Sequence, residues 1–437
     1  MNDIAAIFAF LRYCLGGKKD MSRVIAGMNW QKLYSFSSKQ AILGLCFDGI
    51  ERLGKEYPEE QRLNPIGREL LMTWMGKAQQ IRRQNRKVNT VASKLFSMLR
   101  EDGVRCCILK GQGNALMYPN PYSRTPGDID VWVNASREEI TEYAKCHFKL
   151  EDDIRFHHLE TTMDGVPVEL HFMPCVMNNV VYNRRLQKWF KRNADLQCSN
   201  VVSLPDGAGD IAVPTTAFNV VYQLTHLYHH FFDEGIGMRQ IIDYFLVMDD
   251  FWKVKESFSQ PSRPSLPKEG STAFPKPLSP QGTGDVTALR CSEPLRYKDG
   301  GASKPSPNCA GWDRLGVSGD ATSTAFDVVQ KELKYLGLWK FAGAVMYVLH
   351  KALGLPEEKM IAPIDEKRGK LLLEEILNGG NFGKHFAKYG HFTQQGMAKK
   401  YFLKIWRNMH FVRYFPAEAL SEPIFRTWHF FWRLRQK

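Results

Sequence analysis

The chain lacks the features that mark disulfide-rich, zinc-binding and membrane-spanning proteins. Its nine cysteines are scattered, odd in number, and without a CxxC pair or another spacing typical of metal ligands. The apolar stretch at residues 4–11 is too short to cross a bilayer, and Asp3 stands where a signal peptide carries positive charge. We therefore predict free thiols, no signal peptide, no transmembrane segment and a cytoplasmic location.

Acidic residues are also relatively few. The 59 lysines and arginines outnumber the 46 aspartates and glutamates, so the formal net charge is +13. This favours an anionic partner such as a nucleotide, nucleic acid, lipid headgroup or acidic polysaccharide precursor. Residues 399–407 and 428–435 interleave aromatic with basic side chains. Three interpretations stay open: peripheral contact with a membrane, stacking on single-stranded nucleic acid, or, the favoured one, amphipathic helices whose aromatics pack on the protein.

Hydrophobic periodicity is absent from residues 257–324, which are rich in Pro, Ser, Gly, Thr and Lys. Such a segment buries too little apolar surface to offset its chain entropy, so we predict a disordered, exposed insertion whose deletion leaves folding intact. The 437 residues have room for two or three domains. We predict a helical region at 1–100, an αβ domain at 101–213, and a helical domain at 214–437 that contains the insertion.

Periodicity elsewhere predicts the local structure. Apolar residues recur at helical spacing over 70–81 and 91–99, and an apolar strand follows at 106–109. A short helix is expected over 114–118. A capping box at 136–139, where Ser is followed three residues later by Glu, predicts the start of another helix.

The strongest chemical signal is the segment Gly127-Asp128-Ile129-Asp130. In an extended segment successive side chains point to opposite faces, so Asp128 and Asp130 face the same way while Ile129 packs behind them. Two neighbouring carboxylates repel each other unless a cation lies between them. Hard oxygen ligands suit Mg²⁺, which is usually bound by one or two carboxylates together with substrate phosphates. The segment therefore predicts a magnesium site and a phosphate ester or nucleotide as substrate.

A third carboxylate follows on a later strand. Asp164-Gly165 supplies the positive φ angles of a hairpin turn, and the alternating strand after it places Glu169 and His171 on one face. Glu169 is thus a candidate to join the two aspartates.

These motifs together resemble the nucleotidyltransferase superfold, and more narrowly a family of uncharacterised bacterial nucleotidyltransferases known from bacteroidetes and their relatives. The matching segments are Leu109-Lys110-Gly111, Arg124, Gly127-Asp128-Ile129-Asp130, Glu169-Leu170-His171, residues 226–246 and residues 379–383. The resemblance implies an α+β fold, with a nucleotidyltransferase-like mixed sheet and flanking helices, a helical N-terminal region and a helical C-terminal domain.

The resemblance also implies an activity and roles for the site residues. Mg²⁺, or alternatively Mn²⁺, would support transfer of a nucleotidyl group from an NTP to an unidentified acceptor. Asp128 and Asp130 would hold the metal, and Glu169 would complete a second metal site or act as the base. The further candidates for binding substrate are Lys110, Gly111, Gly113, Arg124, His171 and Arg239.

Two other functions remain open from the sequence. One is a nucleotidyltransferase-type toxin that modifies RNA or protein. The other is a catalytically inactive scaffold that binds a nucleotide or glycan precursor in surface polysaccharide synthesis. Convergence of the three acids within reach of one metal would argue against the scaffold.

Helical spacing suggests two more pairs in the C-terminal part. His226 and His230 lie four residues apart, a spacing that zinc sites use, but no HExxH pattern accompanies them, so lining or packing is the favoured role. Arg239 and Asp243 have the same spacing and are expected to form an ion pair along a helix.

Overall fold

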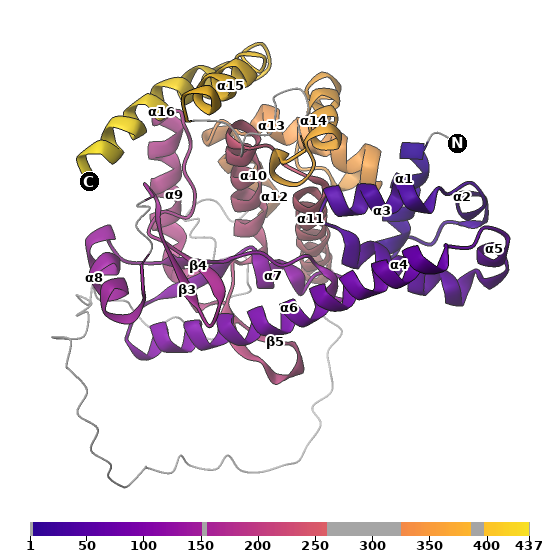
Figure 1. Ribbon diagram of the computed structural model, residues 1–437. Coiled ribbons are helices and arrows are strands. Elements are labelled where there is room, and N and C mark those ends of the chain that lie inside the picture. The colour runs from indigo at the N-terminus through magenta and orange to yellow at the C-terminus, as the bar shows by residue number, and fades with distance from the viewer. Residues whose placement is uncertain (1–2, 151–154, 260–324, 386–396, 437) are drawn as a thin grey trace, which may run out of the picture.

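The computed structural model describes residues 3–150, 155–259, 325–385 and 397–436 (Figure 1). The predicted insertion at 257–324 therefore lies almost entirely outside the described residues, and its predicted disorder stays untested. The described parts form an α+β structure with one mixed sheet of four strands and a small two-stranded sheet, as predicted.

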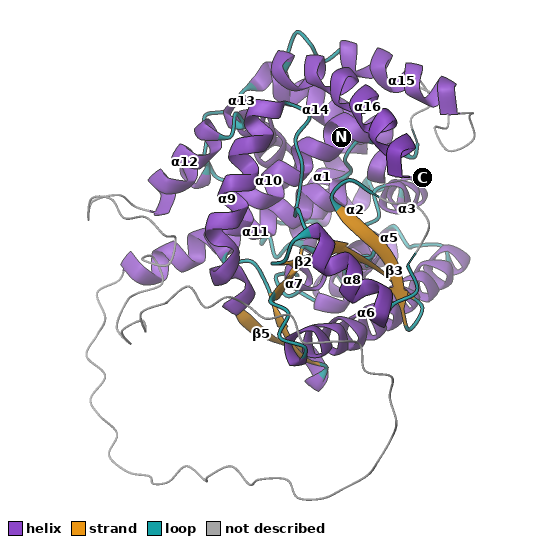
Figure 2. Ribbon diagram, turned by 90° about the vertical axis from the view of Figure 1, so that its left-hand side faces the viewer, coloured by secondary structure: helices purple, strands orange, loops and turns teal. Residues whose placement is uncertain are grey.

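Six helices precede the sheet, in agreement with the predicted helical N-terminal region. They are α1 (Asp3–Cys14), α2 (Ser22–Ala26), α3 (Trp30–Lys39), α4 (Leu43–Glu56), α5 (Pro58–Leu63) and α6 (Arg68–Glu101). The two periodic stretches expected at 70–81 and 91–99 belong to the single helix α6, which has 34 residues. α6 runs beneath the sheet in Figures 1 and 2, while the C-terminal helices lie on the other side.

The main sheet has the strand order β1-β2-β4-β3. Its strands are β1 (Cys106–Leu109), β2 (Ile129–Val133), β3 (His158–Met163) and β4 (Val166–His171), and the helices α7 (Gly111–Ala115), α8 (Arg137–His147) and α9 (Val180–Ser199) lie between or after them. β2 and β4 are parallel, whereas β1 pairs with β2 and β3 with β4 in antiparallel fashion. The small sheet consists of β5 (Val201–Leu204) and β6 (Gly209–Ala212).

Side-chain alternation gives the main sheet two different faces. Ile129, Val131, Val168 and Leu170 are buried in a cluster with apolar residues of α6. The intervening positions point the opposite way, where Trp132 is buried among residues of α9 and the C-terminal helices. Since side chains alternate along each strand, Asp130, Glu169 and His171 also project from this second face.

Within the described residues, seven α-helices follow the small sheet. They are α10 (Thr216–Asp233), α11 (Met238–Ser259), α12 (Ala325–Tyr335), α13 (Trp339–Val348), α14 (Glu366–Gly379), α15 (Met397–Met409) and α16 (Pro416–Gln436). One apolar core joins many of them to α1, α3 and α4, so the N-terminal and C-terminal helical regions are packed together. None of the helices in the described ranges has the length and apolar content needed to cross a membrane.

Local signals were read correctly at the hairpin and at α8. Asp164 and Gly165 take φ angles of 50° and 71° between β3 and β4. Ser136 and Glu139 form the complete capping box of α8. The short helix predicted at 114–118 is wrong in its bounds, because Lys110 turns the chain sharply at φ 51° and α7 begins at once, with Gly111.

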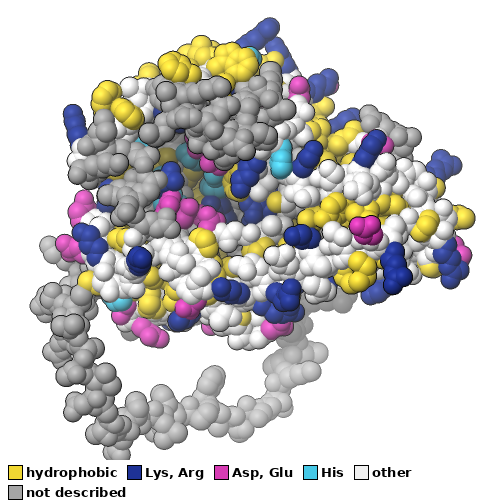
Figure 3. Space-filling view, viewed as in Figure 1, with side chains coloured by type: hydrophobic (Ala, Val, Ile, Leu, Met, Phe, Trp, Pro, Cys, Tyr) yellow, Lys and Arg dark blue, Asp and Glu magenta, His cyan; other side chains and the backbone are white. Residues whose placement is uncertain are grey.

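The two C-terminal helices combine packing with exposure. The two helices contribute Ala419 to the core, and the turn that connects them contributes the buried Phe411 and Phe415. Their outer surface nevertheless carries large exposed apolar side chains, namely Phe402, Trp406, Met409, Leu420, Ile424, Trp428, Phe430 and Phe431. Figure 3 shows hydrophobic side chains gathered at the top of the molecule, over α15 and α16.

Candidate functional site

Two of the three predicted acids, Asp130 and Glu169, come together on neighbouring strands of the main sheet, and Asp128 lies just before β2. Asp130 and Glu169 are register partners on the parallel strands β2 and β4. One ligand atom each from Asp130, Glu169 and His171 lies within 4.8 Å of the others. Asp130 is buried, Glu169 is half-buried, and Asp128 stands exposed immediately before β2. The parallel pairing of two strands distant in sequence thus builds the acidic group.

The negative charges of Asp128, Asp130 and Glu169 repel one another, and a cation between them would relieve this repulsion. The negative charge of Asp130, with that of Glu169, raises the pKa of Asp128 to about 6. Asp130 itself is buried, which alone would raise its pKa, but the charge of Lys110 and a hydrogen bond from His171 outweigh burial and lower it. Asp130 is therefore held ionised, and the repulsion between the carboxylates appears as the raised pKa of Asp128.

Lys110 is the principal cation in contact with Asp130. Its Nζ lies 2.8 Å from Asp130 Oδ1 and 2.8 Å from His226 Nε2, to which it donates. Burial alone would lower the pKa of Lys110, but the charges of Asp130 and Asp128 raise it, so the ammonium stays protonated. The left-handed backbone at Lys110, φ 51°, lets β1 end and α7 begin without an intervening loop.

His171 joins the two strand carboxylates. Its Nε2 lies 3.1 Å from Asp130 Oδ1 and 3.1 Å from Glu169 Oε2. Burial alone would lower its pKa, but these two hydrogen bonds raise it to about 9. Burial alone would raise the pKa of Glu169, but the hydrogen bond from His171 helps to lower it. His171 was predicted to share a face with Glu169, and the structure places it in direct contact.

A small cavity of about 40 Å³ opens beside the acids. Most of the predicted site residues line it: Lys110, Gly111, Arg124, Asp128, Asp130 and Arg239, together with Gly127, Gln223, His226, Leu227, Gln240, Asp243 and Phe382. Figure 3 shows a hollow on this side of the molecule in which acidic, basic and histidine side chains gather. Gly113 is not among the lining residues.

Gly113 has a packing reason to be glycine. A Cβ at this position would lie 2.9 Å from Val213 Cγ1 and 3.3 Å from Val213 Cβ. α7 is thereby pressed against the segment that leads into α10. The predicted contact of Gly113 with substrate stays a prediction, whereas Gly111 reaches the cavity.

The expected ion pair between Arg239 and Asp243 is wrong. Asp243 instead receives two parallel hydrogen bonds from Arg124, at 2.9 Å from Nε and 2.7 Å from Nη2, and a third from the hydroxyl of Tyr118 at 2.7 Å. The i, i+4 spacing fails here because Asp243 is buried and faces the loop before β2. Arg239 donates from Nη1 to the carbonyl of Thr125 at 3.0 Å.

Histidines surround the acids in greater number than sequence reasoning indicated. Six of the twelve in the chain are in ring contact with one another, namely His157, His158, His171, His226, His229 and His230. His226 and His230 were favoured as lining residues, and His226 does line the small cavity. Sequence reasoning did not predict His157 and His158 as site residues. The available signal was that these two adjacent histidines lead into β3, which pairs with the strand that carries Glu169.

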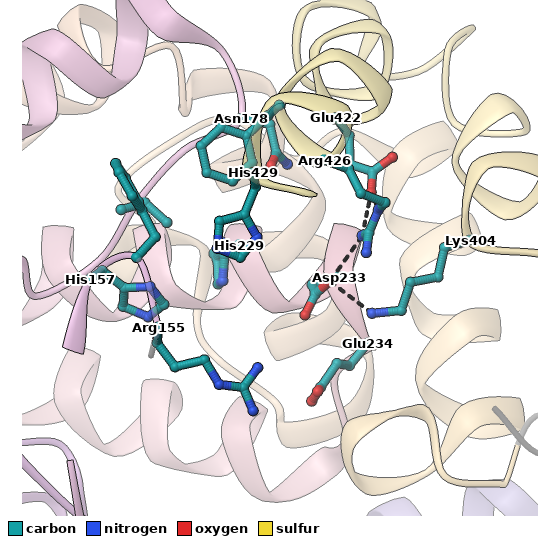
Figure 4. A pocket seen from close by; sticks show the side chains of 13 residues that line it. Arg155, His157, Asn178, His229, Asp233, Glu234, Lys404, Glu422, Arg426 and His429 are labelled. Atoms are coloured by element: carbon teal, nitrogen blue, oxygen red, sulfur yellow. Dashed lines mark hydrogen bonds and ion pairs between the residues drawn. The ribbon is translucent and has the colours of Figure 1, made fainter. Parts of the chain in front are cut away.

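A second cavity, of about 260 Å³, lies on the other side of this histidine group (Figure 4). His157 and His229 stand at one side of it, and Asp233 lies opposite. Lys404 and Arg426, from α15 and α16, bind Asp233 Oδ1 at 2.9 and 3.0 Å. The C-terminal helices therefore complete a polar cavity that adjoins the acidic group.

Comparisons with known proteins identify the family but no characterised relative. A family model described as an uncharacterised nucleotidyltransferase matches residues 26–257. No curated protein and no solved structure matches the chain. The matched range covers more than half of the sequence and includes the whole main sheet with Asp128, Asp130 and Glu169. The chain belongs to this family of uncharacterised nucleotidyltransferases.

Proposed function

We propose that the protein transfers a nucleotidyl group from an NTP to an acceptor, with Mg²⁺ as the metal and Mn²⁺ as an alternative. The observation that carries the proposal is the pairing of Asp130 with Glu169 across two parallel strands, with Asp128 and Asp130 both lining the small cavity. Transfer of this kind needs little covalent help from the protein, so catalysis depends on positioning and on neutralising charge.

The donor set fits magnesium. Asp128, Asp130 and Glu169 would hold the ion through carboxylate oxygens, which are the ligands Mg²⁺ prefers. When bound, the metal would neutralise phosphate charge and align the reacting groups. The raised pKa of Asp128 supports the assignment, because the repulsion that causes it is relieved by a cation between the carboxylates.

Arg239 is the best placed of the proposed phosphate-binding residues. It is buried and lines the small cavity, and its Nε has no hydrogen-bond partner within the described part of the chain. Its guanidinium lies over the ring of Phe382, 5.4 Å from the ring centre. A guanidinium with a free donor matches a phosphate oxygen. Arg124 lines the same cavity, but two of its nitrogens are already bound to Asp243.

Lys110 and His171 are proposed to keep the carboxylate of Asp130 ionised. Both hold protons beside Asp130, so this carboxylate stays ionised although it is buried. Glu169 is proposed either to bind metal or to accept the proton of the attacking hydroxyl. The larger cavity of Figure 4 is proposed to receive the acceptor, because His157 lines it while its ring centre lies 5.6 Å from that of His171.

The exposed surface of α15 and α16 is proposed to contact an anionic membrane. Neither helix exposes an acid in the described residues, because Glu418 and Glu422 are both buried. Exposed aromatic side chains beside cations are typical of proteins that lie on lipid headgroups. Sedimentation with anionic vesicles, lost in a Trp406→Ser/Phe430→Ser variant and absent with neutral vesicles, would support this surface; equal recovery with both vesicle types would contradict it.

Product analysis tests the reaction class. An NTP labelled at the α-phosphate should yield pyrophosphate and a labelled nucleotidyl product, with water as a slow acceptor, and Glu169→Gln should abolish the reaction. Glu138→Gln, at an exposed position on α8, is the matched control. Formation of NDP without pyrophosphate would show phosphoryl transfer and contradict the proposal. Faster transfer when RNA or a protein is added would favour the toxin alternative, whereas an active enzyme of any kind excludes the inactive scaffold.

A further inference from the structure

Three imidazole rings converge beside the carboxylates, on the side of the larger cavity. The ring centres of His157 and His158 are 4.4 Å apart, those of His158 and His171 4.8 Å, and those of His157 and His171 5.6 Å. One nitrogen of each ring lies within 4.8 Å of the other two. His158 and His171 are 6% and 4% exposed, and His157 is half-buried at the cavity wall.

The hydrogen bonds of the two buried rings leave one nitrogen of each without a partner. His158 Nε2 lies 3.2 Å from Glu160 Oε1, and His171 Nε2 lies 3.1 Å from Asp130 and from Glu169. The Nδ1 atoms of both rings are buried and have no hydrogen-bond partner in the ranges that the structure describes. Metal-binding histidines characteristically donate from one nitrogen to a carboxylate, so that the other presents its lone pair to the ion.

The charges around the three rings favour an additional cation. Asp130 contacts Lys110, and Glu160 contacts Arg155 at 2.9 Å, but the ion-pair partners of Glu169 among the described residues are the imidazoles of His158 and His171. Glu169 Oε2 lies 3.6 Å from the unpartnered His158 Nδ1. A carboxylate therefore lies beside the histidine group, next to His158.

The donor set selects a different ion from that of the aspartates. Mg²⁺ is bound by oxygen ligands and rarely by imidazole, whereas Zn²⁺ and Co²⁺ favour imidazole nitrogens in four-coordinate sites. We propose that His157, His158 and His171 bind one zinc-class transition-metal ion, with Glu169 as a neighbouring negative charge. The larger cavity gives such an ion a route to the site through His157.

This inference does not depend on nucleotidyl transfer, and its test separates the two. The full chain, stripped with a chelator and carrying Cys146→Ser, which removes a thiol that is exposed in the described part of the chain, is titrated with ZnCl₂ by calorimetry and with CoCl₂ by visible absorption. We expect one equivalent of Zn²⁺ and the strong visible bands of four-coordinate Co²⁺. His158→Ala should weaken Zn²⁺ binding by about 100-fold or more, since even loss of a partner behind a ligand costs about 10- to 100-fold.

The control variants decide which residues hold the ion. His157→Ala, at a half-buried position, provides a second test should His158→Ala fail to fold, and His147→Ala, at an exposed position on α8, should bind Zn²⁺ like the parent. Asp128→Asn should retain Zn²⁺ while losing Mg²⁺-dependent nucleotide binding. Zinc affinity unchanged in both His157→Ala and His158→Ala, or zinc lost in Asp128→Asn, would overturn the site, as would absence of Zn²⁺ binding by the parent.

Discussion

Arg124 donates two parallel hydrogen bonds to Asp243, and both side chains are only 5% exposed. This pair ties the loop before β2 to α11, across a sequence separation of 119 residues. The same loop leads directly into Asp128, and the same helix carries Arg239, so the pair holds the acidic and basic walls of the small cavity together.

Breaking that pair should destabilise the protein. Arg124→Met leaves Asp243 charged and buried with only Tyr118 as a donor, and we expect a loss of about 3–5 kcal/mol in the free energy of unfolding. Arg124→Lys keeps the positive charge but cannot donate two parallel hydrogen bonds, so its free energy of unfolding should fall by less. Denaturant unfolding measures both variants, and a wild-type midpoint for Arg124→Met would refute the structural role.

Arg239 is predicted to act on nucleotide rather than on folding. Replacing it with lysine keeps a positive charge but removes the planar group above Phe382 and its spare donor. We expect the Kd for Mg·NTP to rise by about 10- to 100-fold, which corresponds to the loss of one charge-assisted hydrogen bond. Arg413→Lys, at an exposed position, serves as the control. Equal nucleotide affinity in the two variants would exclude Arg239 from phosphate binding.

The close approach at Gly113 predicts a size-dependent defect. Gly113→Ala places a methyl group 2.9 Å from Val213 Cγ1, so the variant should lose about 1–3 kcal/mol of stability through overpacking. Val213→Ala in the same chain removes Cγ1, the nearer of the two obstructing atoms, and should restore part of the loss. Thermal unfolding of the two single variants and the double variant checks the coupling. Strictly additive losses would show that the two residues do not press on each other.

The ionisation of Glu418 should lower the stability of the folded protein as the pH rises. Burial, opposed by hydrogen bonds from the backbone N–H groups of Asn178 and Asn179, raises the pKa of this carboxyl to about 7, and the charge of Glu422 adds to the effect. The folded state then binds more protons than the unfolded state between about pH 4.5 and 7. Glu418 favours the folded state below this window, and that contribution is lost as the pH rises, by about 1.4 kcal/mol per pH unit.

Glu418→Gln isolates this effect. Its side chain cannot ionise, so the free energy of unfolding of the variant should depend less on pH between about 4.5 and 7 than that of the wild type. Chemical unfolding at several pH values measures the difference. Parallel stability curves for the two proteins would show that Glu418 has an ordinary pKa in the folded state.

Local rules predicted much of the sheet and its acids. Alternation placed Asp130 and Glu169 on strand faces opposite to the apolar side chains, and the Asp-Gly turn located the hairpin, because both signals depend on neighbouring residues only. The parallel register of β2 with β4, which brings the two acids together, depends on contacts between distant segments. From the sequence, the convergence of Asp130 and Glu169 could therefore be expected only from the family resemblance.

Long-range contacts also explain what was missed. Asp243 pairs with Arg124 instead of with Arg239 one helical turn away, because burial against another segment outweighs a spacing rule for exposed helix surfaces. The gathering of His157 and His158 with His171 follows from the antiparallel pairing of β3 with β4, where His158 is the register partner of His171. Apart from their adjacency in the sequence, His157 and His158 carry no motif that predicts this contact.

Calorimetric titration with each of the four NTPs, with Mg²⁺ and then with EDTA, tests the central claim most directly. The proteins are the wild type, Asp128→Asn/Asp130→Asn, and a control, Asp164→Asn, at the exposed hairpin turn. The account predicts that at least one nucleotide binds the wild type and the control only with Mg²⁺, and that the double variant loses this binding while remaining folded. If no nucleotide binds, or if the folded double variant binds like the wild type, the metal-dependent nucleotide site is contradicted.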